Sequence, residues 1–207
     1  MNFFTKSAIL FSFGVASFTS KAQEILPVGF SASELLEMQQ PEWKEPFYDA
    51  KSSITSPPPG PVRNYAQWEE TQAVTITWTS YTSVLREIVR AARLETQVYI
   101  VCGTSCSGST DSMSVKSYLT AGSVPLSNVH YIYAPCNSVW TRDFSSNSCY
   151  LNDVDSLVQV DWKYNRPTRT KDDTIPRSLC RALNIPLYET TVGPNLLVHT
   201  GGNYMTD

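Results

Sequence analysis

The sequence has little positive charge, few histidines and, after its first residues, no long hydrophobic run. Its 207 residues include 16 Lys or Arg and 19 Asp or Glu, for a net charge of −3. Nucleic-acid binding needs concentrated positive charge, so this balance argues against a nucleic-acid partner. A cationic substrate is electrostatically compatible with it. No later segment approaches the roughly 20 apolar residues of a membrane span, so we expect no membrane-spanning helix.

Histidine and cysteine are too sparse to suggest a metal centre. His130 and His199 match no zinc-ligand spacing with the cysteines, so no zinc site is expected. Both lie in apolar strand patterns typical of structural histidines. The five cysteines are an odd number, which leaves one unpaired if the others form disulfides.

The individual cysteines fit structural positions better than catalytic ones. Cys102 and Cys106 lie in a Gly/Ser-rich stretch, where a small disulfide loop could form. Cys136 and Cys149 have no histidine nearby in sequence. They are therefore predicted to be buried small hydrophobes or disulfide partners.

Residues 1–22 have the layout of a secretory signal peptide. Lys6 supplies positive charge, a short apolar run follows, and Ser20 and Ala22 are small residues suited to signal peptidase. We expect export to the periplasm or the cell exterior, with a mature chain that begins at Gln23. Cleavage removes two lysines, so that 14 basic and 19 acidic residues remain and the net charge becomes about −5.

Residues 23–67 show no regular periodicity and read as a presequence and linker that packs loosely or wraps a domain over 68–207. Four prolines and a glycine fall within 52–61, which favours an extended linker. Within the domain, apolar periodicity predicts a mixed α and β class. Strands are expected at 74–79, 97–102, 130–134, 148–151, 157–162, 187–190 and 196–199, and helices at 84–92, 111–120 and 174–183.

Three polar clusters follow predicted strand ends, where such folds place their chemistry. In the first, Trp140 and Asp143 could hold a planar cation between an indole face and a carboxylate. In the second, Arg166 and Arg169 could clamp a carboxylate, although a solvated polar loop is the plainer interpretation. The third runs from His199 through Gly201-Gly202 to Asp207, and its paired glycines permit close approach of the backbone to a ligand.

Together with Trp68-Glu69 before the first strand, the three clusters resemble the Porphyromonas-type peptidylarginine deiminase family, relatives of the agmatine deiminases. The resemblance covers residues 68–207. It implies an α+β pentein, a pseudo-fivefold β/α propeller, of which this chain would hold roughly two to three of five blades. It also implies hydrolysis of the guanidinium of C-terminal peptidyl-arginine to citrulline and ammonia by a cysteine nucleophile, without a cofactor.

The resemblance assigns roles to five residues. Asp143 and Asp207 would be active-site aspartates, and Trp140 would pack against the arginine side chain. Arg166 and Arg169 would hold the α-carboxylate of an arginine-containing peptide or protein, with Arg169 one residue later than the family pattern. The family's cysteine and histidine lie C-terminal to the Gly-Gly-Asn turn, so this chain alone is expected to be inactive.

Two alternatives remain open. An agmatine deiminase of putrescine biosynthesis would have no substrate carboxylate for the two arginines, and that branch has glutamate where this chain has Thr200. A non-catalytic secreted protein could keep the guanidinium-binding groups without the reaction.

Overall fold

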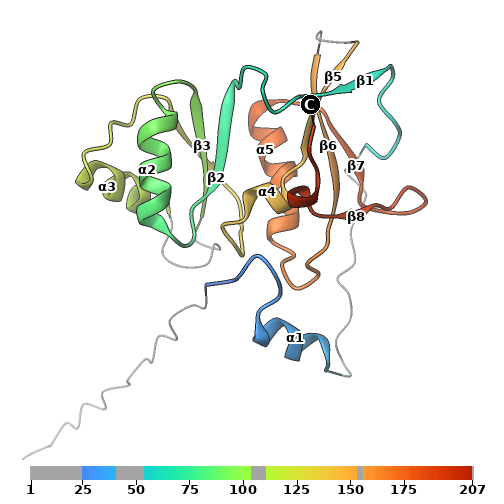
Figure 1. Ribbon diagram of the computed structural model, residues 1–207, viewed down its shortest axis with the longest axis horizontal. Helices are drawn as coiled ribbons and strands as arrows, with labels where there is room; N and C mark the ends of the chain where they lie inside the picture. The colour runs from blue at the N-terminus through green and yellow to red at the C-terminus, as the bar shows by residue number, and fades with distance from the viewer. Residues whose placement is uncertain (1–24, 41–53, 104–110, 153–155, 207) are drawn as a thin grey trace, which may run out of the picture.

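The computed structural model describes residues 25–40, 54–103, 111–152 and 156–206. Figure 1 shows two sheets beside each other, with α4 (Thr141–Phe144) and α5 (Ile175–Leu183) between them and α2 (Thr82–Ala92) and α3 (Ser112–Ala121) on the outer side of the first sheet. The expected signal peptide, Cys106 and Asp207 lie outside the described residues. Within the described ranges, no helix combines the length and apolar character needed to cross a bilayer.

The first sheet is parallel, in the order β2-β3-β4: Ala73–Thr77, Gln97–Cys102 and Val129–Tyr133. Its connections are helices α2 (Thr82–Ala92) and α3 (Ser112–Ala121), which cover one face (Figure 1). Side chains alternate along a strand, so every second residue of β3 faces these helices. The resulting core contains Ile76, Trp78, Leu85, Val89, Val98, Ile100, Cys102, Val115, Leu119, Val124 and Val129.

The second sheet combines antiparallel and parallel pairing. Strand β1 (Val62–Asn64) pairs antiparallel with β5 (Asn147–Leu151), which pairs antiparallel with β6 (Ser156–Tyr164). Strands β7 (Leu187–Thr190) and β8 (Val198–His199) both run parallel to β6. The long β6 thus carries three neighbours, and its C-terminal end leads directly into the polar loop after Tyr164.

Helix α5 (Ile175–Leu183) joins the two sheets. It begins after a 3-10 turn, η1 (Asp172–Thr174), and ends at Asn184, which has the left-handed backbone typical of a helix C-terminus. Its apolar face packs against the side of the first sheet that α2 and α3 leave uncovered. This second core contains Val101, Ile132, Ala134, Cys136, Phe144, Tyr164, Ile175 and Leu179.

Hydrophobic periodicity predicted where the helices and strands of the domain lie. Each expected strand and helix is present, with shifts of a few residues at the ends; the last strand is shortened to β8. The segment expected to be irregular contains more structure than predicted, because helix α1 (Ala32–Met38) and strand β1 lie in it. The disulfide loop between Cys102 and Cys106 is wrong, since Cys102 is free.

Candidate functional site

The Trp140–Asp143 cluster forms a short helix, α4 (Thr141–Phe144), in the loop after β4. The backbone N–H of Asp143 donates to the carbonyl of Trp140 at 2.9 Å. The Thr141 hydroxyl lies 3.0 Å from the Thr77 hydroxyl at the end of β2. These contacts fix the turn and leave Asp143 buried, with 8% of its surface exposed.

The Gly-Gly-Asn turn packs directly onto this aspartate. A Cβ on Gly202 would lie 2.5 Å from Asp143 Oδ1, and one on Gly201 would lie 2.2 Å from the carbonyl oxygen of Arg142. In return, Arg142 donates to the carbonyl of Gly201 at 3.2 Å and to that of Tyr204 at 2.8 Å. The first and third sequence clusters therefore form one site, and the paired glycines are needed for close packing against the carboxylate.

Arg169 is a fully buried carboxylate clamp. Its side chain has 0% exposure and holds the carboxylate of Glu34 in a bidentate ion pair, with Nε to Oε1 at 2.8 Å and an η nitrogen to Oε2 at 2.9 Å. The Thr168 hydroxyl donates to the same Oε1 at 2.7 Å. The loop after β6 was expected to bind a carboxylate through its arginines, and in the structure it does so with a carboxylate of the chain itself.

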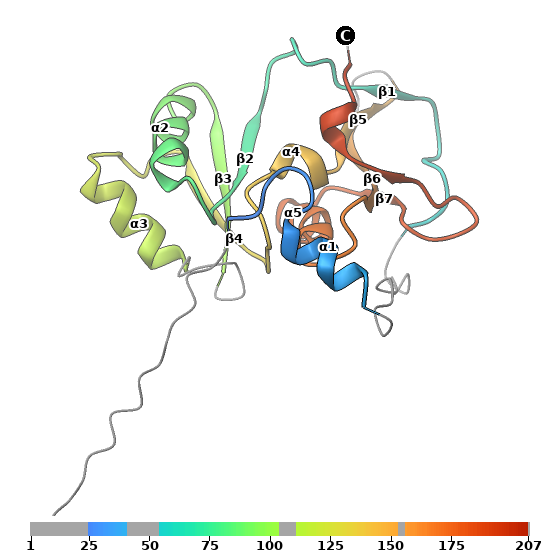
Figure 2. The ribbon, with the colours of Figure 1, turned by 60° about the horizontal axis from the view of Figure 1, so that its bottom comes forward.

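Arg166 and Trp140 also contact the N-terminal segment. The guanidinium of Arg166 lies over the ring of Phe30, 4.6 Å from its centroid, and donates to the carbonyl of Val28 at 3.2 Å. The indole N–H of Trp140 donates to the carbonyl of Leu26 at 2.8 Å. Figure 2 shows this segment and α1 lying against the α4 and α5 side of the molecule.

Tyr164 connects the two halves of the site, although no sequence pattern singles it out. Its ring packs edge-on against Phe144, and its buried hydroxyl makes no hydrogen bond with any described residue. Burial raises its pKa to about 12, and the charges of Arg169, Asp143, Asp172 and Arg166 all act on it. Tyr164 therefore lies within electrostatic range of both the predicted guanidinium-binding aspartate and the predicted carboxylate clamp.

Two buried aspartates anchor the clamp loop. Asp172 accepts the Asn137 and Ser138 N–H groups at 2.6 and 3.0 Å and the Ser138 hydroxyl at 2.6 Å. Asp173 accepts the Tyr164 N–H at 2.9 Å. Burial raises the pKa of Asp172 to about 6 and that of Asp173 to about 7, although these hydrogen bonds oppose the shift. The loop is thus tied to the strand ends on both sides and is not simply a solvated turn.

None of the described thiols is suited to be the nucleophile. Burial raises the pKa of Cys102 to about 11 and that of Cys180 to about 12, and it raises the pKa of Cys149 as well. Cys136 is disulfide-bonded. A catalytic cysteine needs a lowered pKa and a nearby base, so these four residues are structural, as was predicted for Cys136 and Cys149.

The two histidines make structural contacts. His130 Nε2 lies 2.6 Å from Gln97 Oε1, and its ring stacks on Tyr99. His199 packs edge-on between Trp162 and Tyr204. Among the residues that the structure describes, no three His, Cys, Asp or Glu side chains gather closely enough to hold a metal ion.

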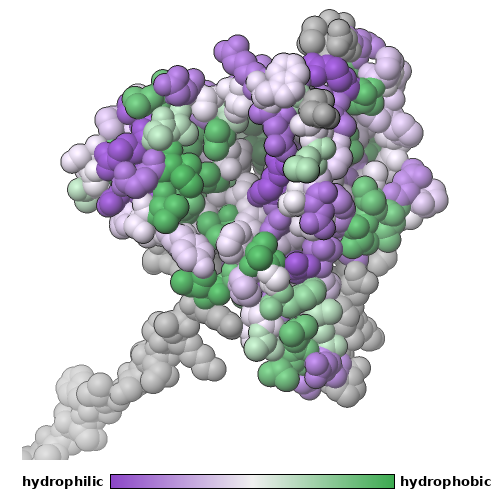
Figure 3. All heavy atoms as spheres, viewed as in Figure 1, coloured by the Kyte–Doolittle hydropathy of each residue, from purple (hydrophilic) through white to green (hydrophobic). Residues whose placement is uncertain are grey.

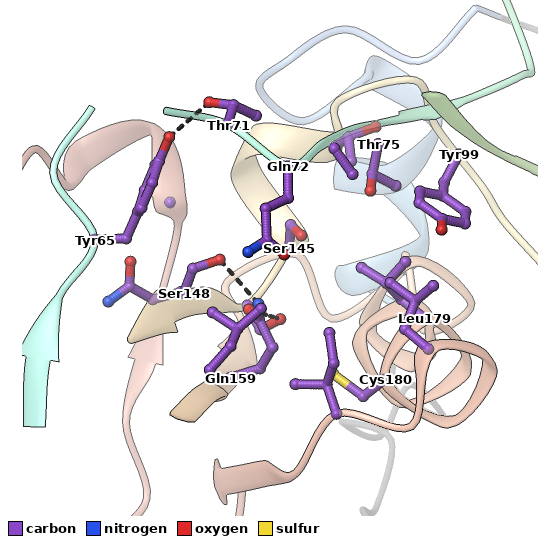
Figure 4. Close-up of a pocket in the computed structure, with 18 of the residues that line it drawn as sticks. Tyr65, Thr71, Gln72, Thr75, Tyr99, Ser145, Ser148, Gln159, Leu179 and Cys180 are labelled. Atoms are coloured by element: carbon purple, nitrogen blue, oxygen red, sulfur yellow. Dashed lines mark hydrogen bonds between the residues drawn. The ribbon is translucent and has the colours of Figure 1, made fainter. Parts of the chain in front are cut away.

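A cleft of about 910 Å³ opens between the two sheets (Figure 4). Ser148 and Gln159 are hydrogen-bonded on one side of it, while Tyr99 and Leu179 lie on the other. Its lining includes Arg142, Gly201 and Tyr204, which belong to the site around Asp143, but none of the four described residues assigned from the sequence (Trp140, Asp143, Arg166, Arg169). The cleft therefore adjoins the candidate site, while the four assigned side chains lie at the strand ends and loops outside its lining.

Comparisons with known proteins identify the family and the fold. The family model described as Porphyromonas-type peptidyl-arginine deiminase matches residues 63–207. Among solved structures, an agmatine deiminase of C. jejuni is 16% identical with a TM-score of 0.52, over 68% of this chain and 41% of that one. An agmatine deiminase of Enterococcus faecalis is 16% identical with a TM-score of 0.54, over 70% and 41%. The mixed α/β fold is thus that of the agmatine deiminases, and the chain spans about two fifths of the length of these structures. The number of propeller blades stays a prediction.

Proposed function

This chain belongs to the Porphyromonas-type peptidylarginine deiminase family, and from that membership we propose that it supplies the arginine-binding part of a guanidinium-hydrolysing active site. The substrate is a peptide or protein that ends in arginine, and the products are citrulline and ammonia. The signal-peptide layout of residues 1–22 supports action outside the cytoplasm. The cysteine nucleophile and the histidine belong to the remaining length that its relatives possess.

The observation that carries this proposal is a buried aspartate and a buried arginine on neighbouring loops, one for each end of an arginine residue. Asp143 is buried against a glycine pair, where a carboxylate can accept two N–H groups of a guanidinium. Arg169 already holds a carboxylate in bidentate geometry. A C-terminal arginine carries both complementary charges.

The residues of this chain would bind and orient the substrate. Asp143 fixes the guanidinium plane and stabilises its positive charge while a thiolate adds to the central carbon. Trp140 packs against the aliphatic part of the arginine, and Arg166 and Arg169 hold the α-carboxylate. Ammonia leaves from the tetrahedral species, and water then releases the thiol and leaves the ureido oxygen of citrulline. Because attack needs a thiolate, the raised pKa values of the described thiols explain why this chain alone is expected to give no turnover.

Agmatine deimination is the second candidate, favoured by the fold comparison. Agmatine has no carboxylate, so it would leave the clamp unused. The third candidate is a guanidinium-binding protein without catalysis.

One assay distinguishes the three. Citrulline or ureide release is measured for a protein of the relatives' full length, with a peptide ending in arginine, a peptide with internal arginine, and agmatine. Asp143→Asn should lower kcat/KM about 100-fold or more on every substrate, because the grip on the guanidinium is weakened. Arg166→Ala should penalise mainly the peptide with a free C-terminal carboxylate. Asp111→Asn, at the half-buried N-cap of α3, is the matched control.

Each contrary result has a specific meaning. If the protein prefers agmatine and Arg166→Ala leaves its activity unchanged, agmatine replaces the peptide as the proposed substrate. Guanidinium binding without turnover in the long protein would leave the non-catalytic candidate. If Asp143→Asn leaves turnover unchanged, the assignment of Asp143 to guanidinium binding is wrong.

A further inference from the structure

The N-terminal segment 25–40 contacts three of the four described side chains assigned from the sequence, namely Trp140, Arg166 and Arg169. Leu26 accepts from Trp140, and Val28 accepts from Arg166. Farther along, Glu34 accepts from Arg169. Contact with one of these side chains could be incidental packing. Contact with all three, from residues within ten positions of each other, means that the segment lies over the surface that a substrate would need.

The carboxylate of Glu34 is bound as a ligand would be. Its Oε1 accepts from Thr168 and from Arg169 Nε at 2.7 and 2.8 Å, and its Oε2 accepts from an η nitrogen of Arg169 and from the Ser31 N–H at 2.9 and 2.8 Å. Burial opposes the charge, but these hydrogen bonds outweigh it and lower the pKa of Glu34 to about 2. The carboxylate therefore stays ionised under all ordinary conditions.

The sequence of α1 shows that this contact depends on charge. Glu34 is the buried residue of α1, whereas Leu35 and Leu36 next to it are 46% and 61% exposed, and apolar side chains gather on that outer surface (Figure 3). A helix docked by the hydrophobic effect would bury its leucines and expose its glutamate. Here the orientation is the reverse.

We propose that segment 25–40 is an internal ligand of the carboxylate clamp, in which Glu34 occupies the place of the substrate's α-carboxylate and the segment must leave before a peptide ending in arginine can bind. This inference rests on the proposed function for the identity of the substrate, but not for the existence of the internal ligand. The surface that receives the segment consists of Trp140, Arg166, Thr168 and Arg169.

Competition between the segment and a substrate is physically reasonable. A tethered carboxylate acts at a high effective concentration, so it excludes weakly binding free carboxylates. A peptide ending in arginine can displace it because its guanidinium also binds Asp143, a contact that Glu34 cannot make. One η nitrogen of Arg169 has no hydrogen bond with any described residue, so the clamp has an unused donor.

Glu34→Gln is the informative variant, because glutamine can keep the capping box with Ser31 but loses the charge that Arg169 binds. Glu37→Gln, at an exposed position of the same helix, is the matched control. Binding to the full chain is measured by fluorescence anisotropy with a labelled peptide ending in arginine, and with the same peptide carrying a C-terminal amide.

Glu34→Gln should bind the free-carboxylate peptide about tenfold more tightly than wild type, because the competent state is no longer occluded. The amide peptide and the Glu37→Gln chain should show no such gain. If both chains bind the free-carboxylate peptide and Glu34→Gln binds it no more tightly than wild type, the segment does not occlude the clamp and the proposal is overturned.

A second probe tests the internal ligand without the proposed substrate. A synthetic peptide of residues 25–40 should bind the Glu34→Gln chain, and the same peptide with glutamine at position 34 should bind about tenfold less well or not at all. If the 25–40 peptide with Glu34 binds and the peptide ending in arginine does not, segment 25–40 is an internal ligand but arginine is not the substrate. If both versions of the peptide bind equally, the segment is held by packing and the proposal fails.

Discussion

The two glycines beside Asp143 differ in what a methyl group would meet, and this difference separates stability from binding. At Gly201 the obstacle is a backbone carbonyl at 2.2 Å, which cannot move without shifting α4. At Gly202 it is the tip of the Asp143 side chain at 2.5 Å, which can rotate away. The same substitution should therefore damage the fold at one position and the site at the other.

We expect Gly201→Ala to lower the free energy of unfolding by about 1–3 kcal/mol, as overpacking of a rigid contact does. Gly202→Ala should cost less stability but weaken binding of a peptide ending in arginine by about tenfold, because the carboxylate is displaced. Urea denaturation measures the first effect and fluorescence anisotropy the second. Equal losses of stability with equal affinities would contradict the geometry.

The buried aspartates of the clamp loop make stability depend on pH. Burial raises the pKa of Asp173 from 3.8 to about 7, so the folded state binds a proton that the unfolded state releases between these values. Stability should therefore fall as the pH rises from about 4 to 7, by an amount of the order of a few kcal/mol. Asp161 and Asp172, whose pKa values burial also raises, act in the same direction.

Asp173→Asn should flatten this dependence without removing it, since the amide oxygen can still accept the Tyr164 N–H. Urea unfolding of both proteins at several pH values from 4 to 8 provides the test. Asp173→Asn should lower the free energy of unfolding least at the upper end of that pH range, where the value can even exceed that of wild type because wild type must ionise a buried carboxyl group. Parallel curves would show that Asp173 is ionised in the folded protein.

Residues selected from the sequence were those whose partners lie close in sequence or whose motif is compact. Trp140 and Asp143 fall within four positions, and the glycine pair is contiguous. Glu34 and Tyr164 were missed because their roles depend on contacts across the fold; Glu34 reaches Arg169 over 135 positions. Hydrophobic periodicity contains no information about such a pair.

Hydrophobic periodicity identified the helices and strands that bury a whole face. Strand β3 was predicted with its observed bounds, and α2 and α3 with shifts of one or two residues. Helix α1 has a capping box at Ser31 and Glu34 but only seven residues and no buried apolar face, so periodicity could not indicate it. Strand β1 has three residues, too few for an alternating pattern, and it exists because β5 offers an edge.

The core beneath α2 and α3 depends on one face of α3. Leu119 on α3 is 0% exposed and packs in this core, whereas Met113 on the same helix is 75% exposed. Leu119→Ala should lower the free energy of unfolding by about 2–5 kcal/mol, since it leaves a cavity. Met113→Ala should change it by no more than about 0.5 kcal/mol. Chemical denaturation of both variants tests this, and similar losses would mean that α3 packs by another face.

At the scale of the whole molecule, the first sheet presents two edges. In the order β2-β3-β4, neither β2 nor β4 has a second strand partner among the described residues. Large apolar side chains are also exposed around it: Trp68, Val84, Leu94 and Tyr133 are 77%, 56%, 67% and 67% exposed. Unpaired strand edges and exposed apolar groups favour pairing with another chain.

The isolated chain should therefore be marginally stable or self-associate. Sedimentation should show species larger than a monomer as concentration rises, and the thermal midpoint should rise with protein concentration, because association stabilises the folded state by mass action. Tyr133→Lys, which places a charge at the exposed end of β4, should shift the chain toward monomer, since lysine on an edge strand opposes pairing. Thr120→Lys, at an exposed position of α3 away from the edge, controls for added charge alone. A sharp, concentration-independent melt of a monomer would show instead that these edges are stable without a partner.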